Sequence, residues 1–433
     1  MSHGQPRILF LTLSDDVGSE RIVSEMGRRG ATCAVLGRRD AIAARSLRVV
    51  RHHRLPSRGG MWGAALGVAR HLEALAAGWR PDAVVPLDDM AAQVLRDLAE
   101  APRTGADLRG ILERSLGDPS HYRASCCRAL LIEAAAALGV RTPAQRRAGD
   151  LPQALAAAAE IGYPLMLKRE GTCGGSGVAL VRDEAGLAGA FRAADRKARA
   201  KRAMRRLFGF GAARASSPIT LQAHVAGTLA MRTVACERGR VLDGISLAAE
   251  RLDPPVTGSS TVVRPLDHPE MAEAARRLVA KLGCSGFVSF DFILSADGRA
   301  HLIEMNARPV GSGHLGARFG HDVYGAWLKR FPGFHDADPP PAADAPRAVA
   351  LFPKEMGRDP ASPRLAAGGD LLHDVPWDEP AVVADYRDRL VRRHPAEAAT
   401  ITRRLGPGPE AADGAPRAAR PQRFVDLTLD PPH

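Results

Sequence analysis

The first third of the chain alternates short apolar runs with helical patterns, and this alternation restricts the fold more than any other feature. Strands are expected at 8–11, 31–36, 47–50 and 83–86, and helices at 18–29, 61–77 and 90–98. Such alternation is typical of a parallel sheet covered by helices on both faces. A dinucleotide-binding sheet would need G-x-G-x-x-G after the first strand, but residues 12–16 read Thr-Leu-Ser-Asp-Asp. The sequence therefore argues against a nicotinamide oxidoreductase.

Beyond residue 120 the pattern becomes a mixture of helices and strands. Helices are expected at 125–138, 154–160, 184–206 and 270–282, and strands at 165–168, 219–224, 231–236 and 241–248. Residues 286–294 and 300–306 are expected to pair as a hairpin around Asp297-Gly298, a common turn sequence. This second block is therefore α+β, whereas the first is α/β.

Composition limits the classes of function. A chain of 433 residues predicts two or three domains. It has no apolar run long enough to span a membrane and no sections of a signal peptide at its start, so we expect a cytoplasmic protein without a membrane partner. The net charge of +12 favours anionic substrates over nucleic acid, because the few aromatic residues (5%) are not interleaved with the cations. The six cysteines form no C-x-x-C pair and are typical of reduced thiols.

A lysine and a glycine-rich segment lie next to each other in the second block. Lys168 ends an expected strand, and Gly174, Gly175, Ser176 and Gly177 belong to the segment that follows it. Glycines let backbone amides approach phosphate oxygens, and the lysine adds a point charge. A glycine-rich hairpin without a ligand explains the segment equally well. Because these four residues bury little apolar surface, they predict a mobile loop.

The strand expected at 219–224 ends in Gln222, Ala223, His224 and Val225, two residues before Gly227. An ordinary strand is the simpler interpretation. The alternative is a hinge between two lobes whose backbone hydrogen-bonds the edge of an adenine.

Asp291, Glu304 and Asn306 carry the most specific signal. Asp291 is flanked by apolar residues, and Glu304 and Asn306 lie two apart, on one face of a strand. Buried carboxylates are costly unless they are paired or bind a metal, and three oxygen ligands suit Mg²⁺. Arg308 lies on the same face and could reach a transferring phosphoryl group. Ion pairs with neighbouring arginines, and a surface position for Arg308, are the alternatives.

In this order the segments resemble the ATP-grasp superfamily, which includes D-alanine–D-alanine ligase, glutathione synthetase and biotin carboxylase. The resemblance covers residues 5–330 and rests mainly on 162–177 and on Glu304-Met305-Asn306-Ala307-Arg308. It implies a Rossmann-like pre-ATP-grasp domain at 1–120, an N-lobe with a linker helix at 121–217, and a C-lobe at 218–330. Composition adds a C-terminal extension at 331–405 and a disordered tail at 406–433.

The resemblance also implies roles for individual residues. Lys168 matches the lysine that binds the α- and β-phosphates, Gly174 to Gly177 the loop that closes over the triphosphate, and Gln222 to Val225 the adenine hinge. Asp291, Glu304 and Asn306 match the Mg²⁺ (or Mn²⁺) ligands, and Arg308 an arginine near the γ-phosphate.

Three features depart from the family pattern. Arg128 stands where a first nucleotide-binding lysine is usual, Ala223 follows the hinge glutamine where an acid is common, and no ribose carboxylate is evident at 227–232. His314, Arg264, Asp88 and Asp89 are weaker substrate-site candidates, and Cys173 is more simply loop filler than a nucleophile.

The implied activity is that of an ADP-forming ligase, which activates a carboxylate as an acyl phosphate with ATP and joins it to an amine or another nucleophile. Its partners would be these small molecules, and a homodimer stays open. A bicarbonate-activating, carboxylase-like enzyme and a non-catalytic ATP-binding protein are the alternatives.

Overall fold

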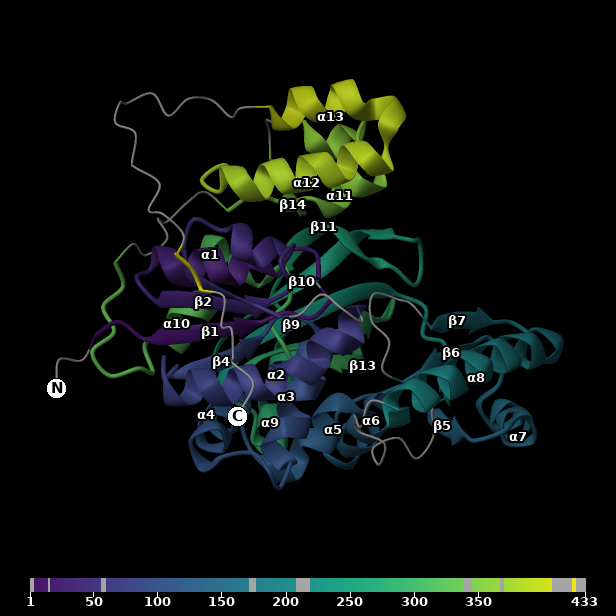
Figure 1. The fold of residues 1–433 in the computed structure, drawn as a ribbon. Helices are drawn as coiled ribbons and strands as arrows, with labels where there is room; N and C mark the ends of the chain where they lie inside the picture. The colour runs from purple at the N-terminus through teal and green to yellow at the C-terminus, as the bar shows by residue number, and fades with distance from the viewer. Residues whose placement is uncertain are drawn as a thin grey trace.

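A computed structural model of the chain describes residues 4–14, 16–55, 60–170, 177–207, 219–337, 345–366, 370–406 and 423–425. Its first sheet has the strand order β16-β3-β2-β1-β4, and all neighbouring strands are parallel (Figure 1). The strands are β1 (Arg7–Leu11), β2 (Thr32–Gly37), β3 (Val49–Arg54), β4 (Ala83–Pro86) and β16 (Arg423–Val425). The parallel sheet predicted from the alternating pattern is therefore confirmed, although the third strand lies further along the chain than 47–50.

Alternation along β1 divides the core between two faces of this sheet. Ile8 and Phe10 pack with α1 (Glu20–Arg28), whereas Leu9 and Leu11 pack with the helices of the other face. Those helices are α2 (Gly60–Ala77), α3 (Asp89–Glu100) and α4 (Ala106–Leu116). Side chains two apart on a strand share a face, so the apolar run in β1 serves two helical layers. Helix α4 was not predicted.

The expected helix at 125–138 is two helices. In the structure α5 (Tyr122–Cys126) ends before Cys127, and α6 (Arg128–Ala137) begins after it. Cys127 has extended backbone angles (φ −118°, ψ 111°), which interrupt the helical hydrogen bonds. The apolar pattern runs through this break, so periodicity alone predicted one helix. The break makes Arg128 the first residue of α6.

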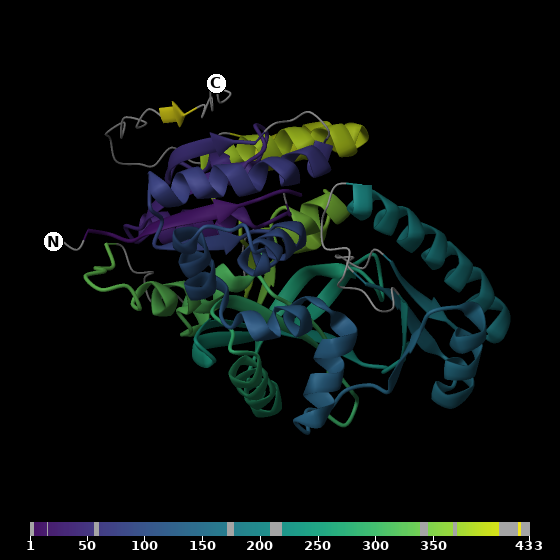
Figure 2. The ribbon, with the colours of Figure 1, turned by 60° about the horizontal axis from the view of Figure 1, so that its bottom comes forward.

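A four-stranded antiparallel sheet with the order β5-β8-β6-β7 forms a lobe that extends from the rest of the molecule (Figures 1 and 2). Its elements are β5 (Gln145–Ala148), α7 (Leu151–Ile161), β6 (Leu165–Arg169), β7 (Val178–Val181), α8 (Glu184–Leu207) and β8 (Ile219–Ala223). Leucines and alanines of α7 and α8 pack on its sheet and give the lobe its own small core.

The third sheet has the order β13-β12-β9-β10-β11-β14-β15. Its elements are β9 (Thr228–Glu237), β10 (Arg240–Asp253), β11 (Ser259–Leu266), α9 (Pro269–Leu282), β12 (Gly286–Leu294), β13 (Ala300–Asn306), β14 (Ala348–Ala350) and β15 (Leu371–His373). The predicted hairpin is present as β12 and β13, and β11 was missed. Residues of the C-terminal extension thus continue this sheet beyond β11. They also form α11 (Lys354–Arg358), α12 (Pro380–Arg393) and α13 (Ala398–Leu405).

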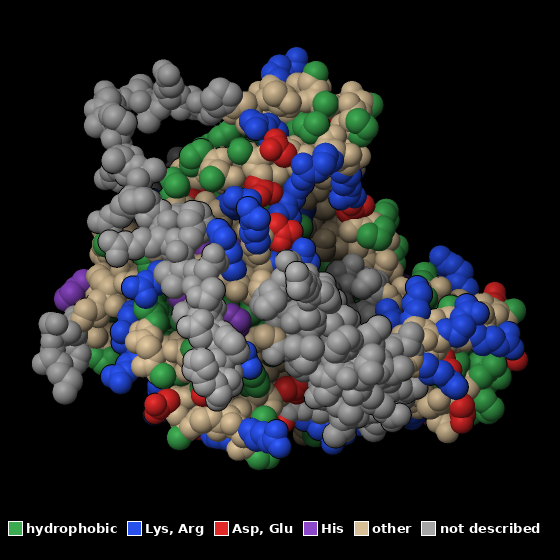
Figure 3. All heavy atoms as spheres, in the orientation of Figure 1, with side chains coloured by type: hydrophobic (Ala, Val, Ile, Leu, Met, Phe, Trp, Pro, Cys, Tyr) green, Lys and Arg blue, Asp and Glu red, His purple; other side chains and the backbone are tan. Residues whose placement is uncertain are grey.

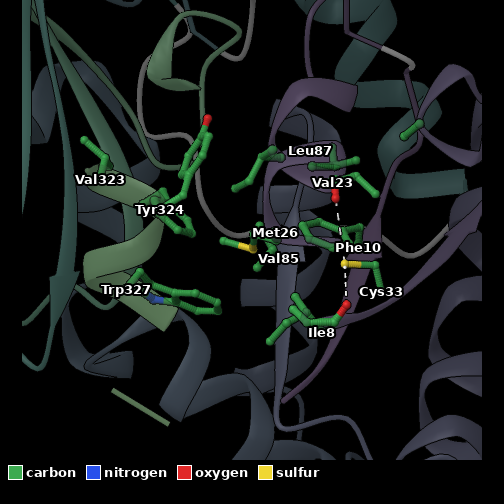
Figure 4. Packing of buried hydrophobic residues seen from close by; sticks show 14 of the residues in the cluster. Ile8, Phe10, Val23, Met26, Cys33, Val85, Leu87, Val323, Tyr324 and Trp327 are labelled. Carbon is green, nitrogen blue, oxygen red and sulfur yellow. Dashed lines mark hydrogen bonds between the residues drawn. The ribbon is translucent and has the colours of Figure 1, made fainter. Parts of the chain in front are cut away.

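Helix α10 (Val323–Leu328) joins the first sheet to the third. Tyr324 and Trp327 point toward Phe10 and Met26 (Figure 4), and the side chain of Trp327 is fully buried. Arg29, almost completely buried, donates to Asp322 at 2.5 Å beside this contact. Burying large apolar side chains stabilises by roughly 1.5–3 kcal/mol each, so the contact holds the two units together firmly.

The surface and the tail bear on the remaining expectations. On the face seen in Figure 3, Lys and Arg side chains are interspersed with acidic ones over the lobe and the C-terminal helices. No helix within the described ranges is long and apolar enough to cross a membrane. Within the tail at 406–433, Arg423–Val425 form β16, which pairs with β3. The rest of 407–433 lies outside the described residues.

Candidate active site

A pocket of about 620 Å³ lies where the lobe, the third sheet and the first sheet meet. Most of the predicted site residues line it: Arg128, Lys168, Gln222, Ala223, His224, Val225, Asp291, Glu304, Asn306 and Arg308. Gly174, Gly175 and Ser176 lie outside the described residues, and Gly177 directly precedes β7. The structure therefore brings together residues that are up to 180 positions apart in the sequence.

Lys168 lies on β6 with its side chain buried and 5% exposed. Its Nζ donates a hydrogen bond to Oε1 of Gln222 on the neighbouring strand β8, at 2.6 Å. Burial, followed by the nearby charge of Arg128, lowers the pKa of Lys168 to about 8. Nε2 of Gln222 is buried and has no hydrogen-bond partner among the described residues. An anionic or polar ligand beside these groups would offset the free-energy cost of the buried ammonium and of the unpaired amide.

Asp291 and Glu304 face each other across β12 and β13, whose register pairs them directly. Nδ2 of Asn306 donates to Oδ2 of Asp291 at 3.2 Å. Burial, and then the negative charge of Glu304, raises the pKa of Asp291 to about 7. Two carboxylates so close together in one pocket repel each other and attract a cation.

The donor set at this hairpin fits a hard divalent cation. It offers two carboxylates and one amide oxygen, and Mg²⁺ prefers such oxygen ligands while taking the others from phosphates and water. Among the described residues, no group of three or more His, Cys, Asp or Glu side chains could hold a metal. A cation here would thus depend on Asn306 and on ligand oxygens as well.

Arg128 contacts this carboxylate pair from the central helix. Its guanidinium donates to Oε1 of Glu304 at 2.6 Å. The backbone amides of Arg128 and Ala129 donate to Glu170, at 3.1 and 3.2 Å, so Glu170 caps the start of α6 and orients it. The side chain of Arg128 therefore reaches into the pocket from the N-terminal end of α6, which Glu170 holds in place.

Arg308 forms ion pairs with the first sheet's domain. Its guanidinium donates to both carboxylate oxygens of Asp89, at 2.7 and 3.1 Å, and lies 3.1 Å from Asp16. Asp88, by contrast, is fully buried and accepts from the amides of Leu13 and Ala91. The suggestion that Asp88 contacts substrate is therefore wrong: it caps α3 and holds the end of β1.

Two further sequence candidates lie away from the pocket. His314 is enclosed between Arg21 and Asp374, and its Nε2 lies 2.9 Å from Oδ2 of Asp374. Arg264 is exposed on β11 and does not line the pocket. Neither lines the pocket, although Ser259 and Ser260 of β11 and residues 310–312 before His314 do. Cys173 lies outside the described residues.

Asp16 and Lys354 line the pocket and were missed by sequence reasoning. Asp16 follows β1, and ligands of parallel sheets bind beyond the carboxyl ends of the strands, so its position was a usable signal. Burial, opposed in part by Arg308, raises the pKa of Asp16 to about 6. Lys354 comes from the C-terminal extension, where no sequence feature marked it.

Comparisons with known proteins concern part of the sequence and the fold. Residues 128–208 match the family described as carbamoyl-phosphate synthase L chain, ATP binding domain. The comparison with curated proteins found no match to the sequence.

Three solved structures are similar in fold to about three quarters of the chain. The biotin carboxylase domain of 2-oxoglutarate carboxylase from Hydrogenobacter thermophilus is 17% identical, with a TM-score of 0.56 over 75% of this chain and 69% of that one. Biotin carboxylase from Campylobacter jejuni is 16% identical, with a TM-score of 0.56 over 78% and 72%. N5-carboxyaminoimidazole synthase from Aspergillus clavatus is 16% identical, with a TM-score of 0.51 over 78% of each chain. The chain therefore has the fold of the ATP-grasp superfamily, which confirms the resemblance seen in its sequence.

Proposed function

We propose that the protein is an ADP-forming, Mg²⁺- and ATP-dependent ligase that activates a carboxylate and joins it to an amine. The observation that carries this proposal is the convergence of Lys168 and Arg128 with Asp291, Glu304 and Asn306 in one pocket. The two cationic side chains suit the phosphates of a nucleoside triphosphate, and the neighbouring carboxylates suit its metal ion. The proposed units are the pre-ATP-grasp domain at 1–120, the lobes at 121–217 and 218–330, and the extension at 331–405.

One end of the pocket, which we call the nucleotide end, would hold ATP. It consists of Arg128, Lys168, Gln222 to Val225, Asp291, Glu304 and Asn306. Lys168 and Arg128 would bind phosphate oxygens. The backbone at 223–225, where the strand pairing of β8 ends at Ala223, would hydrogen-bond the adenine edge. A bound Mg²⁺ would neutralise the charge of the phosphates and make the γ-phosphorus more electrophilic.

The proposed ligase reaction has two steps. A carboxylate oxygen of the substrate attacks the γ-phosphorus, the bond to the β-phosphate oxygen breaks, and ADP leaves. Arg308, which lies between the metal ligands and Asp16, would balance the charge that develops on the transferred phosphoryl group. The amine then attacks the acyl carbon, loses a proton, and phosphate departs. No side-chain nucleophile takes part in these steps.

A bicarbonate-activating enzyme is the second candidate, favoured by a specific observation. The Hydrogenobacter structure is described as a complex with MgADP and bicarbonate, and the Aspergillus structure as one with ADP and 5-aminoimidazole ribonucleotide. Both candidates share the nucleotide end and the acyl phosphate intermediate. They differ in the acid that is activated.

Measuring ADP release tests the proposal. The protein is incubated with ATP and Mg²⁺, together with pooled organic acids and amines in one arm and with bicarbonate and amines in the other. We expect acid-dependent ADP release and a product whose mass equals acid plus amine minus water. Release in the bicarbonate arm alone would favour the carboxylase candidate. ADP release in neither arm, with nucleotide binding intact, would leave a non-catalytic ATP-binding protein.

A further inference from the structure

The pocket has a second end, built from three segments that are distant in the sequence. They are Asp16, Val17 and Ser19 after β1, residues 309–312 after β13, and Leu351 with Lys354 from the C-terminal extension. We call this the acid end. Arg308 lies at its junction with the nucleotide end. Unlike the nucleotide end, it uses no residue of the four-stranded lobe.

The two cations at the acid end differ in how their charges are balanced. Arg308 is held by Asp89 and lies 3.1 Å from Asp16. The ammonium of Lys354 has no hydrogen-bond or ion-pair partner among the described residues, although the side chain is half-buried and lines the pocket. A half-buried ammonium without a partner is costly, and an anion bound beside it would offset that cost. Burial, and then the charge of Arg308, lowers the pKa of Lys354.

The backbone that carries Lys354 is held firmly on both sides. Before it, the amide of Phe352 donates to Asp374, whose carboxylate also lies 2.9 Å from Nε2 of His314. After it, Glu355 is fully buried and accepts hydrogen bonds from Arg358 and Ser362, at 2.6 and 2.5 Å. The segment is therefore preorganised, and the lysine is presented to the pocket at little further entropic cost.

The extension as a whole is fixed to the first domain next to this site. The hydroxyl of Tyr386 on α12 donates to Glu20 at 2.9 Å and accepts from the amide of Gly18 at 3.1 Å. Glu20 and Gly18 lie a few residues beyond Asp16, so the same contacts that dock α12 hold the first wall of the acid end.

We propose that Lys354 binds the carboxylate of the acid substrate, so that the C-terminal extension forms part of the substrate site. This inference rests on the proposed function, because it names the group that recognises the acid to be activated. Val17, Val310 and Leu351 would contact the apolar part of that acid. A short, singly charged carboxylate is expected to bind better than inorganic phosphate. Arg308 is already paired with Asp89 and Asp16, so the ammonium of Lys354 is the cation left to balance the charge of the ligand.

Anion binding without nucleotide tests the assignment directly. Dissociation constants for acetate, malonate, succinate and inorganic phosphate are measured calorimetrically at constant ionic strength. The proteins are the wild type, Lys354→Met, Lys354→Arg and Lys281→Met, whose lysine is exposed on α9. We expect at least about tenfold weaker carboxylate binding in Lys354→Met, the scale for losing a hydrogen bond to a charged group. Lys354→Arg should retain most of the affinity, and Lys281→Met all of it.

The outcomes separate this inference from the proposed function. Carboxylate binding that is unchanged in Lys354→Met, preferential binding of phosphate, or no binding of any probe to the wild type would each overturn the role of Lys354. Affinity for MgADP, measured in the same variants, should stay within about twofold and shows that Lys354→Met is folded. If Lys354-dependent carboxylate binding is found without acid-dependent ADP release, the proposed ligase activity fails while the binding site stands.

Discussion

The two ends of the pocket are built in different ways. The nucleotide end takes its side chains mainly from paired strands: Lys168 and Gln222 from β6 and β8, and Asp291 and Glu304 from β12 and β13. The acid end takes its residues from segments after β1 and β13 and from the C-terminal extension. Strand pairing positions the first set, whereas docking between separate units positions the second.

This difference has a physical consequence. Strand pairing places Asp291 opposite Glu304, and a one-residue slip of either strand would turn the side chains of that strand to the other face of the sheet. Lys354 reaches the pocket only while Asp374, Tyr386 and their partners hold the extension in place. Substitutions should therefore affect the two ends separately, and the four predictions below test that separation.

The largest effect is expected at the carboxylate pair. Glu304→Gln removes a negative charge from the side chains proposed to bind Mg²⁺. Turnover of ATP should therefore fall by roughly 10²-fold or more. Asp291→Asn should do the same. Folding should survive, because each variant removes one of two neighbouring negative charges; burial, and then this proximity, raises the pKa of Asp291. Asp297→Asn, an exposed acid in the turn of the same hairpin, is the control for initial-rate assays. Near-normal turnover with unchanged Mg²⁺ dependence in both variants would contradict the metal assignment.

The next effect is expected at Lys168. Lys168→Met removes the buried ammonium, and affinity for MgADP should fall by about 10- to 100-fold, the range for hydrogen bonds to charged groups. The melting temperature should change little, because removing the desolvation cost of the buried ammonium offsets the hydrogen bond that Gln222 loses. Isothermal titration of the variant, with Lys281→Met as control, measures the change. If Lys168→Met bound MgADP as the wild type does, the lysine would not contact phosphate.

A smaller effect, confined to the acid end, is expected at Asp374. Asp374→Asn keeps the shape but weakens the contacts to Phe352, Arg21 and His314. The KM for the acid should rise by several fold, and stability should fall by about 1–3 kcal/mol. The KM for ATP should stay unchanged. Asp370→Asn, exposed just before β15, is the matched control. An equal rise in both KM values would show that the two ends are not separable.

The smallest effect concerns pH and the docking of the extension. Burial lowers the pKa of His373 from its ordinary value of 6.5 to about 4. The unfolded chain therefore binds a proton as the pH falls below 6.5 while the folded chain does not, so stability is lost between pH 6.5 and 4. His373→Gln should lessen the drop in melting temperature between pH 7.5 and 5 by about 2 °C. The exposed His335→Gln should leave that drop unchanged, and an identical drop in His373→Gln would contradict the lowered pKa.

Much of the fold followed from local patterns, and the failures have physical causes. Alternating apolar runs predicted the parallel sheet, and Asp297-Gly298 predicted the hairpin that carries Asp291 and Glu304. The break at Cys127 was missed because the apolar pattern continues across it. Helix α4 and strand β11 were also missed, although Leu108, Ile111 and Leu112 give α4 a helical spacing. His314 and Arg264 were plausible by position along the chain, but His314 pairs with Asp374 and Arg264 is exposed, so neither lines the pocket.

The sequence by itself marked the candidate residues of the nucleotide end, because a strand's period of two places Glu304 and Asn306 on one face, and local motifs mark Lys168 and its glycines. The tertiary structure alone decided that Arg308 pairs with Asp89 and Asp16, that Asp88 is a helix cap, and that Lys354 lines the pocket. These facts depend on how units far apart in the chain pack together. Such packing depends on shape and buried polar contacts, which leave no periodic trace along the sequence.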